Sequence, residues 1–465
     1  MKTTKLLFSL CLAMLAPHAF ATGEAEQTSK EPKETASESI VKISGNQEQE
    51  STKKKKKRSI LKTEEGGKGL TIGGYGEAVY SRNFYSDNYL RYSSPETYKD
   101  ADGHGRFDLP HVVIMLGYNF GKGWSMGAEI EFEHGGTESA IEIEENEGGE
   151  YESEIERGGE VALEQFWIQK SFCPQLNIKA GHIIVPVGAT NAHHLPTEYF
   201  GVYRPEGENT IFPCTWHETG ISVWGQAGDW RYEAMLLPGL DSDRFGRQSW
   251  IHDASGSPYE FKLGNALAGA FRVDNYSIPG LRLSISGYGG NSFSNSLLRS
   301  SSSIYDGVKG TVLIGAFDFH YNAHNWVVRG NFDYGHLSDS YEITRWNKRQ
   351  QGNSPSKAQD VASDAIVGGI EAGYDIFSQI SKLHEKEQKL YVFGRYDYYD
   401  SMHKVETGVY EYDWCGRSRI AAGINYYPIK DIVVKGEYSI GLLKSPYNNE
   451  PSFSIGIAYA GFFTK

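Results

Sequence analysis

Residues 452–463 carry the sequence SFSIGIAYAGFF, in which large apolar side chains alternate with small ones. Phe453, Ile455 and Ile457 fall on one side of an extended chain, and serine, glycine and alanine fall on the other. Successive side chains of a β-strand point to opposite faces, so a period of two residues indicates a strand. The stretch therefore predicts a β-strand with one strongly apolar face.

The same alternation recurs along the chain. In residues 124–133, apolar residues alternate with small ones and with Glu129, Glu131 and Glu133. These glutamates require water, so the opposite face contacts either a protein core or lipid. Sixteen segments share the pattern: residues 69–81, 105–120, 124–134, 161–171, 177–187, 216–226, 230–238, 264–273, 281–291, 310–321, 326–336, 364–374, 388–399, 417–427, 431–443 and 452–463.

The connections between these segments alternate in length. Residues 121–123, 227–229 and 428–430 form short turns, whereas residues 82–104 and 135–160 form long loops. Short turns at one end and long loops at the other are typical of outer-membrane barrels, in which closure satisfies every backbone hydrogen bond. We therefore expect an all-β fold, a transmembrane antiparallel β-barrel of about 16 strands in the bacterial outer membrane.

The N-terminal part of the chain has a different composition. Residues 1–21 combine two lysines, a short apolar stretch and an Ala-Phe-Ala site, which predicts a secretory signal peptide. Residues 22–68 are polar and contain the basic run 53–58, which predicts a disordered periplasmic tail. Residues 69–465 remain for the barrel. The formal net charge of −13 disfavours nucleic acid as a partner.

Several short motifs accompany the strands between residues 70 and 250: Arg106-Phe107, LEQFWI at 163–168, Gly181-His182, Pro186-Val187-Gly188, Pro205-Glu206-Gly207-Glu208 with Ile211, and TWHETG at 215–220. Together they resemble the phosphate-selective porin O and P family of Gram-negative outer membranes, in a form associated with Bacteroidetes-type bacteria. The resemblance implies a sixteen-stranded and usually trimeric barrel. It also implies that the third long loop, residues 188–215 here, folds into the lumen and narrows the channel.

The charges of the predicted interior depart from this family, whose anion-selective members carry a ladder of lumenal arginines and a lysine cluster. The alternation assigns nine basic and eleven acidic residues to the inner face. The predicted pore-lining or constriction residues are Glu129, Glu131, Glu133, Arg329, Asp333, Arg395, Asp397, Arg417, Arg419, Lys435, Glu437, His193, His194, Glu198, Arg204, Glu206 and Glu208. Selectivity follows the charge at the constriction, so we expect a general or weakly cation-selective porin rather than an anion funnel. The basic residues on strands 388–443 still allow a local basic wall opposite the glutamates, and phosphate or another anion stays an alternative solute.

Two loops raise the question of bound cations. Residues 188–215 hold imidazoles and carboxylates, but their spacing matches no fixed face, so a charged constriction is favoured over a metal site. Residues 135–160 contain many glutamates, which either bind Ca²⁺ or Mg²⁺ at the cell surface or are simply solvated. We expect no cofactor beyond such an ion, and we expect lipid and lipopolysaccharide around the barrel.

The sequence contains no HExxH motif and no phosphate-binding glycine loop. We therefore predict a channel for small hydrophilic solutes and ions, and no enzyme. The alternative from another class is a non-conducting barrel that binds a partner through its long acidic loops. Cys214 and Cys415 are either isolated thiols or a bridge between loops.

Overall fold

The computed structural model describes residues 68–144, 152–213, 215–255, 262–296, 303–349 and 360–464, and these residues are mostly β-strand. The strands are β1 (Gly69–Asn83), β2 (His104–Asp108), β3 (His111–Gly121), β4 (Trp124–Glu144), β5 (Glu152–Cys173), β6 (Leu176–Ile184), β7 (His217–Ala227), β8 (Trp230–Pro238), β9 (Leu267–Ile278), β10 (Leu281–Asn291), β11 (Thr311–Ala323), β12 (Trp326–Leu337), β13 (Asp364–Asp375), β14 (Lys389–Lys404), β15 (Gly416–Ile429), β16 (Ile432–Gly441) and β17 (Ser452–Phe462). The predicted signal peptide and nearly all of the predicted tail lie outside the described residues, as does Cys214.

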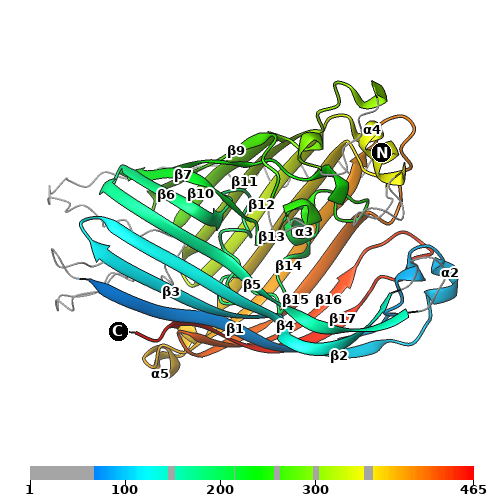
Figure 1. Ribbon diagram of the computed structural model, residues 1–465. Helices are drawn as coiled ribbons and strands as arrows, with labels where there is room; N and C mark the ends of the chain where they lie inside the picture. Colours follow the sequence, from blue (N-terminus) through cyan, green and yellow to red (C-terminus); the bar gives the residue numbers. More distant parts are fainter. Residues whose placement is uncertain are drawn as a thin grey trace, which may run out of the picture. The chain divides into compact units, whose positions relative to one another are not determined.

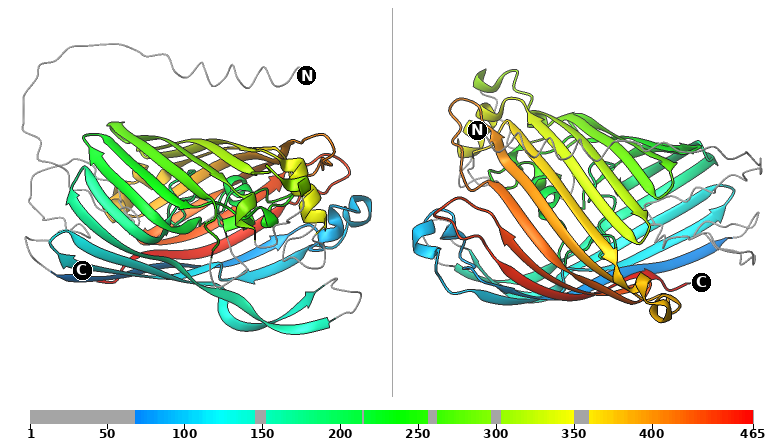
Figure 2. Two further views of the ribbon diagram at one scale, coloured as in Figure 1. Left: turned by 45° about the horizontal axis from the view of Figure 1, so that its top comes forward. Right: turned by 180° about the vertical axis from the view of Figure 1, so that it is seen from behind.

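All the strands join one antiparallel sheet that closes on itself (Figures 1 and 2). Closure is made by β1, which pairs with β17 along Gly73–Asn83 on one side and with β2 and β3 on the other. β2 and β3 follow one another along β1, separated by Leu109 and Pro110; proline has no N–H to donate to the ladder. The wall is therefore a closed barrel of sixteen strands, as the sequence predicts.

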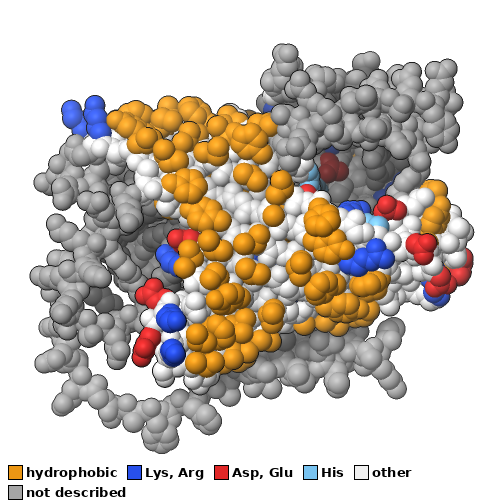
Figure 3. Space-filling view, turned by 90° about the horizontal axis from the view of Figure 1, so that it is seen from below, with side chains coloured by type: hydrophobic (Ala, Val, Ile, Leu, Met, Phe, Trp, Pro, Cys, Tyr) orange, Lys and Arg blue, Asp and Glu red, His pale blue; other side chains and the backbone are white. Residues whose placement is uncertain are grey.

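The outer face of the barrel is apolar (Figure 3). On β17, Phe453, Ile455 and Ile457 are 44%, 45% and 52% exposed, whereas Ala458 and Ala460 are buried inside. The same outward exposure of large apolar side chains recurs around the wall. An apolar band of this kind fits the hydrocarbon of a bilayer, and bacterial proteins of this form span the outer membrane. The barrel is a transmembrane barrel of that membrane.

The two ends of the barrel differ. At one end lie short turns and the C-terminus, together with the helices η6 (Ile376–Gln379) and α5 (Ser381–His384) (Figure 1). The long connections at the other end carry η1 (Tyr89–Arg91), α2 (Pro95–Tyr98), η2 (Ser242–Arg244), η3 (His252–Ser255), η4 (Phe293–Asn295), η5 (Ser303–Tyr305) and α4 (Ser340–Arg349). None of the helices in the described part of the chain has the length and apolar character needed to cross a membrane.

One predicted loop is wrong in its bounds. β4 runs on to Glu144 and β5 begins at Glu152, so most of the expected loop 135–160 is a β-hairpin that extends the two strands. Cross-strand pairing continues there, for example between Ile141 and Ile155. Glutamates at every second position are consistent with a strand, but a segment rich in acidic residues also fits a solvated loop, which is why the sequence predicts a loop here.

The outer half of the interior holds a second feature that the alternation does not show. Loop residues such as Phe245, Trp250 and Ile251 are buried against inward-facing apolar residues of the wall, among them Val312 and Leu337. These contacts form one continuous hydrophobic cluster inside the barrel. The lumen is therefore filled in this region by packed side chains.

Candidate functional site

Residues 185–216, which we call the inward loop, connect β6 to β7 and enter the barrel. Val185, Leu195 and Trp216 are no more than 1% exposed. Asn191 ties the two stems of the loop together, since its Nδ2 donates to the carbonyls of Val185 at 2.7 Å and Trp216 at 3.0 Å. Its Oδ1 accepts from the amide of Trp216. The sequence-based expectation of a long loop folded into the lumen is confirmed.

The short helix α3 (Glu206–Ile211) lies within the inward loop and packs against β13 and β14 (Figure 1). Glu208, on α3, accepts hydrogen bonds from the amides of Ala189 at 2.8 Å and Thr190 at 2.5 Å. Its Oε1 also accepts from Asn331 at 3.2 Å, which links the loop to β12. Glu208 therefore holds the start of the loop and its helix together.

The middle of the inward loop crosses to the opposite wall. Lys435 on β16 donates through Nζ to the carbonyls of Tyr199 at 3.1 Å and Gly201 at 2.7 Å. Glu437 accepts from the amide of Val202 at 3.0 Å. The ring of Phe200 stacks on Phe393, with centroids 5.3 Å apart. Residues 197–202 are therefore held to the wall by hydrogen bonds and aromatic packing.

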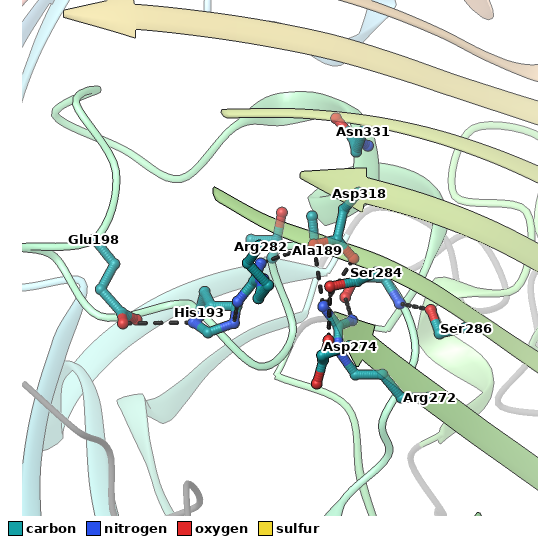
Figure 4. A network of polar contacts seen from close by, with 12 residues as sticks. Ala189, His193, Glu198, Arg272, Asp274, Arg282, Ser284, Ser286, Asp318 and Asn331 are labelled. Carbon is teal, nitrogen blue, oxygen red and sulfur yellow. Dashed lines mark hydrogen bonds and ion pairs between the residues drawn. The ribbon is translucent and has the colours of Figure 1, made fainter. Parts of the chain in front are cut away.

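A network of ion pairs fixes the beginning of the inward loop to β9, β10 and β11 (Figure 4). Arg272 lies 2.8 Å from both Asp274 and Asp318, and its Nη1 donates to the carbonyl of Gly188 at 2.8 Å. Arg282 also pairs with Asp318, at 2.7 Å, and contacts His193 of the loop. Every charged group named here has an oppositely charged or polar partner, so the network positions the loop.

The predicted basic residues of β14–β16 do lie close together, but each has an acidic or carbonyl partner. Arg395 lies 2.8 Å from Asp397 and 3.3 Å from Glu437. Arg417 pairs with Glu450 at 3.3 Å, and Arg419 pairs with Glu206 of the inward loop at 2.5 Å and with Glu450 at 3.6 Å. Lys435 donates to two carbonyls of the inward loop. The expected basic wall is therefore neutralised locally.

The predicted pore-lining residues are either buried or partly buried in the structure. Among the predicted residues, the buried ones are Glu129, Glu131, Asp333, Arg395, Asp397, Arg417, Lys435, Glu437, His194 and Glu208. The partly buried ones are Glu133, Arg329, Arg419, His193, Glu198, Arg204 and Glu206. Arg329 pairs with Glu371 at 2.7 Å. Burial lowers the pKa of His194 to about 3, so this loop imidazole is neutral at physiological pH.

Asp274 and Glu164 are buried carboxylates inside the barrel that are not among the predicted site residues. Asp274 joins the network of Figure 4, but the predicted strand ends at residue 273, whereas β9 continues to Ile278. Glu164 faces inward because of a β-bulge, in which Glu129 pairs with Gln165 and Ile130 with Leu163. Alternation counted back from the inward-facing Trp167 and Gln165 places Glu164 on the outer face, and no sequence signal marks the bulge.

The chain is thus an outer-membrane β-barrel protein with a loop anchored across its lumen. No family model matches it, so the resemblance to the O and P porins stays unconfirmed. An uncharacterized protein of Aquifex aeolicus (strain VF5) is 26% identical over 381 residues, which cover 80% of this chain and 75% of that protein.

Among solved structures, the outer membrane channel DcaP of Acinetobacter baumannii is similar, with a TM-score of 0.49 and 10% identity over 86% of this chain and 99% of that one. Salmonella typhi OmpF in complex with daunomycin has a TM-score of 0.47 and 12% identity over 84% and 97%. With TM-scores below 0.5, these similarities add nothing to the barrel that the strand pairing already defines.

Proposed function

We propose that the barrel is an outer-membrane channel for the passive diffusion of small hydrophilic solutes and ions, narrowed by the inward loop. The observation that carries this proposal is the combination of a sixteen-stranded wall and a charged interior crossed by the anchored inward loop. A wall of that size encloses enough space for an aqueous lumen unless loops fill it. Assembly as a homotrimer in contact with lipopolysaccharide, and binding of Ca²⁺ or Mg²⁺ by the acidic hairpin at 135–160, belong to the same proposal.

We propose weak cation selectivity for this channel. Arginines and Lys435 on β14–β16 are already engaged by carboxylates or carbonyls, which leaves little positive potential for a passing anion. Glu133, which lies 3.8 Å from His111, is partly exposed inside the barrel, where its charge acts on a solute. These pairings favour a cation over the phosphate that the family resemblance implies.

The second candidate is a non-conducting barrel that binds a partner through its long loops. The hydrophobic cluster in the outer half of the interior favours it, because Trp250 and Leu337 are fully buried where a porin lumen is normally wet. In this case the inward loop and the cluster close the passage, and the loops at the outer end provide the binding surface.

The deciding measurement is the zero-current potential of the refolded full chain in a planar bilayer, across a tenfold KCl gradient and with EDTA present. We expect a stable conductance with cation preference. Glu133→Lys should shift the potential towards anions, and Glu96→Lys on the exposed helix α2 is the matched control that should leave it nearly unchanged.

The other outcomes decide between the alternatives. Anion preference of the wild-type chain restores phosphate or another anion as the solute. A folded barrel that carries no current contradicts the channel and favours the binding barrel.

A further inference from the structure

His111, Glu131, Glu133 and Glu164 converge on the inner face of β3, β4 and β5, and we call them the His111 cluster. Nδ1 of His111 lies 2.7 Å from Oε1 of Glu131 and 3.8 Å from Oε1 of Glu133. One ligand atom from each of these three residues lies within 4.8 Å of the other two. Donors bound to one ion at about 2.1 Å lie about 3.0–3.5 Å apart, and the observed separations lie on both sides of this range, so small side-chain shifts bring the three donors onto one ion.

Strand register builds the His111 cluster. His111 on β3 is directly opposite Glu133 on β4, and Glu131 lies two residues along the same face. The bulge in β5 adds Glu164, the extra residue between Leu163 and Gln165, to this inner face. Bulges commonly redirect a side chain at a functional site. Three neighbouring strands thus deliver four potential ligands to one place.

Glu164 carries the observation that points to a ligand. The residue is 2% exposed, and its Oε1 accepts a hydrogen bond from the hydroxyl of Thr215 at 2.7 Å. Its Oε2 is buried and has no hydrogen-bond partner among the described residues. The carboxyl group of Glu131 lies beside it, close enough for the two carboxyl groups to share a proton, and without a proton or a cation between them they repel each other. A buried acceptor without a donor is costly, and a cation between the two carboxylates removes that cost.

The charges around the His111 cluster also favour a cation. Glu129 lies on the same face and accepts from Gln165 at 2.5 Å, so four carboxylates share this part of the wall with one imidazole. Arg204 and Lys179 are the cations within electrostatic reach of Glu164 and Glu129. Lys179 also lies 4.0 Å from Glu233. Arg204 and Lys179 face four carboxylates here, and Lys179 is also shared with Glu233. Negative charge is therefore in excess around the cluster.

We propose that the His111 cluster binds one divalent transition-metal ion, with His111, Glu131 and Glu133 as ligands and Glu164 as a further oxygen donor. An imidazole nitrogen combined with carboxylate oxygens suits Zn²⁺ or Mn²⁺ better than Ca²⁺ or Mg²⁺, which take oxygen ligands. The site is separate from the acidic hairpin at 135–160, and it does not depend on whether the barrel conducts.

The test is a calorimetric titration of the full chain with Zn²⁺ after removal of metals with EDTA, repeated with Mn²⁺ by electron paramagnetic resonance. We expect one ion per chain at this site and no competition from equimolar Mg²⁺. His111→Gln and Glu164→Gln should each weaken binding at least about tenfold. Asp253→Asn, which alters a histidine and carboxylate pair outside the wall, is the matched control and should not change the affinity.

Folding of each variant is checked by its resistance to SDS before boiling, which does not depend on metal or current. Unchanged affinity in both His111→Gln and Glu164→Gln overturns the proposal and assigns the ion to another part of the chain. A folded wild-type barrel that binds neither ion also overturns it; Glu131 and Glu164 then share a proton. Because no current is measured, failure here is distinct from failure of the channel.

Discussion

Gly373 shows how the position of the inward loop depends on one missing side chain. The ring of Phe200 lies over this glycine of β13, and a Cβ at position 373 would come within 2.3 Å of the ring. The ring also stacks on Phe393 and lies beneath Arg329. The position of Phe200 over β13 therefore requires a residue without a side chain at position 373.

We predict that Gly373→Ala displaces Phe200, lowers the free energy of unfolding by about 1–3 kcal/mol and raises the single-channel conductance. The matched control is Gly315→Ala on β11, where the added Cβ meets nothing within 4 Å. Thermal unfolding in detergent and bilayer recording are the two measurements. Equal effects of the two substitutions would show that Phe200 does not set the position of the loop.

Single residues also mark the limit of what alternation predicts. Period two assigns Lys435 and Glu437 to the inner face, where the structure buries them. It does not reveal that Lys435 bonds the carbonyls of Tyr199 and Gly201, more than two hundred residues earlier in the chain. Glu164 escapes altogether, because a bulge changes the parity of a strand without a recognisable sequence. The face of the strand on which a side chain lies thus follows from the local sequence, whereas its bonding partners follow from the fold as a whole.

At the scale of elements, the strands were predictable and the structures that fill the barrel were not. β8 and β10 have the predicted bounds, because polar turns delimit clear alternation. The expected loop at 135–160 is instead mostly hairpin, and the helices of the long loops carry no comparable period. Loops that pack inside a barrel obtain their stability from tertiary contacts, which a local pattern does not encode.

The loop segment 239–255 provides a prediction on pH. Burial, and then the neighbouring charge of Asp243, raise the pKa of Asp241 to about 7. An unfolded aspartate titrates near 3.9, so the packed loop binds an extra proton between about pH 4 and pH 7. The loop should therefore lose stability as the pH rises through this window. Its protection against hydrogen exchange should fall by at most about tenfold per pH unit.

Hydrogen exchange of residues 239–255, corrected for intrinsic rates, measures this dependence. Asp241→Asn stays neutral and retains the oxygen that accepts from the amide of Asp243, so it should remove most of the slope and leave the smaller part that comes from Asp243, whose pKa burial also raises. Asp253→Asn is the control in the same loop, since the hydrogen bond from His252 lowers the pKa of Asp253. A slope as steep in Asp241→Asn as in the wild-type chain would rule out Asp241 as its source.

At the scale of the whole molecule, the interior of the barrel combines two kinds of packing. Charged groups anchor the inward loop at mid-barrel, whereas apolar groups fill the outer half. The composition predicts a barrel but not this division, because strand residues inside the outer half are small or apolar and alternate like any buried strand. A passage through the barrel therefore opens only if the apolar cluster is displaced as well as the charged groups that anchor the inward loop.

Trp250 joins the parts of this apolar filling. It is fully buried, its Nε1 donates to the carbonyl of Ala362 at 3.1 Å, and its ring meets that of Phe212 in the inward loop edge to face. The ring also covers Gly335 of β12. One side chain therefore connects an outer loop, the inward loop, the segment after α4 and the wall.

We predict that Trp250→Ala lowers the free energy of unfolding by about 3–5 kcal/mol and increases the conductance, because the cavity loosens the contact with Phe212. Trp326→Ala is the control: Trp326 is 44% exposed on the outer face, so its loss removes contacts with lipid and Tyr374 but none inside the lumen. If Trp250→Ala is destabilised and its conductance stays at the wild-type value, the apolar cluster supports the fold without obstructing the passage. The inward loop and its ion pairs would then form the whole constriction.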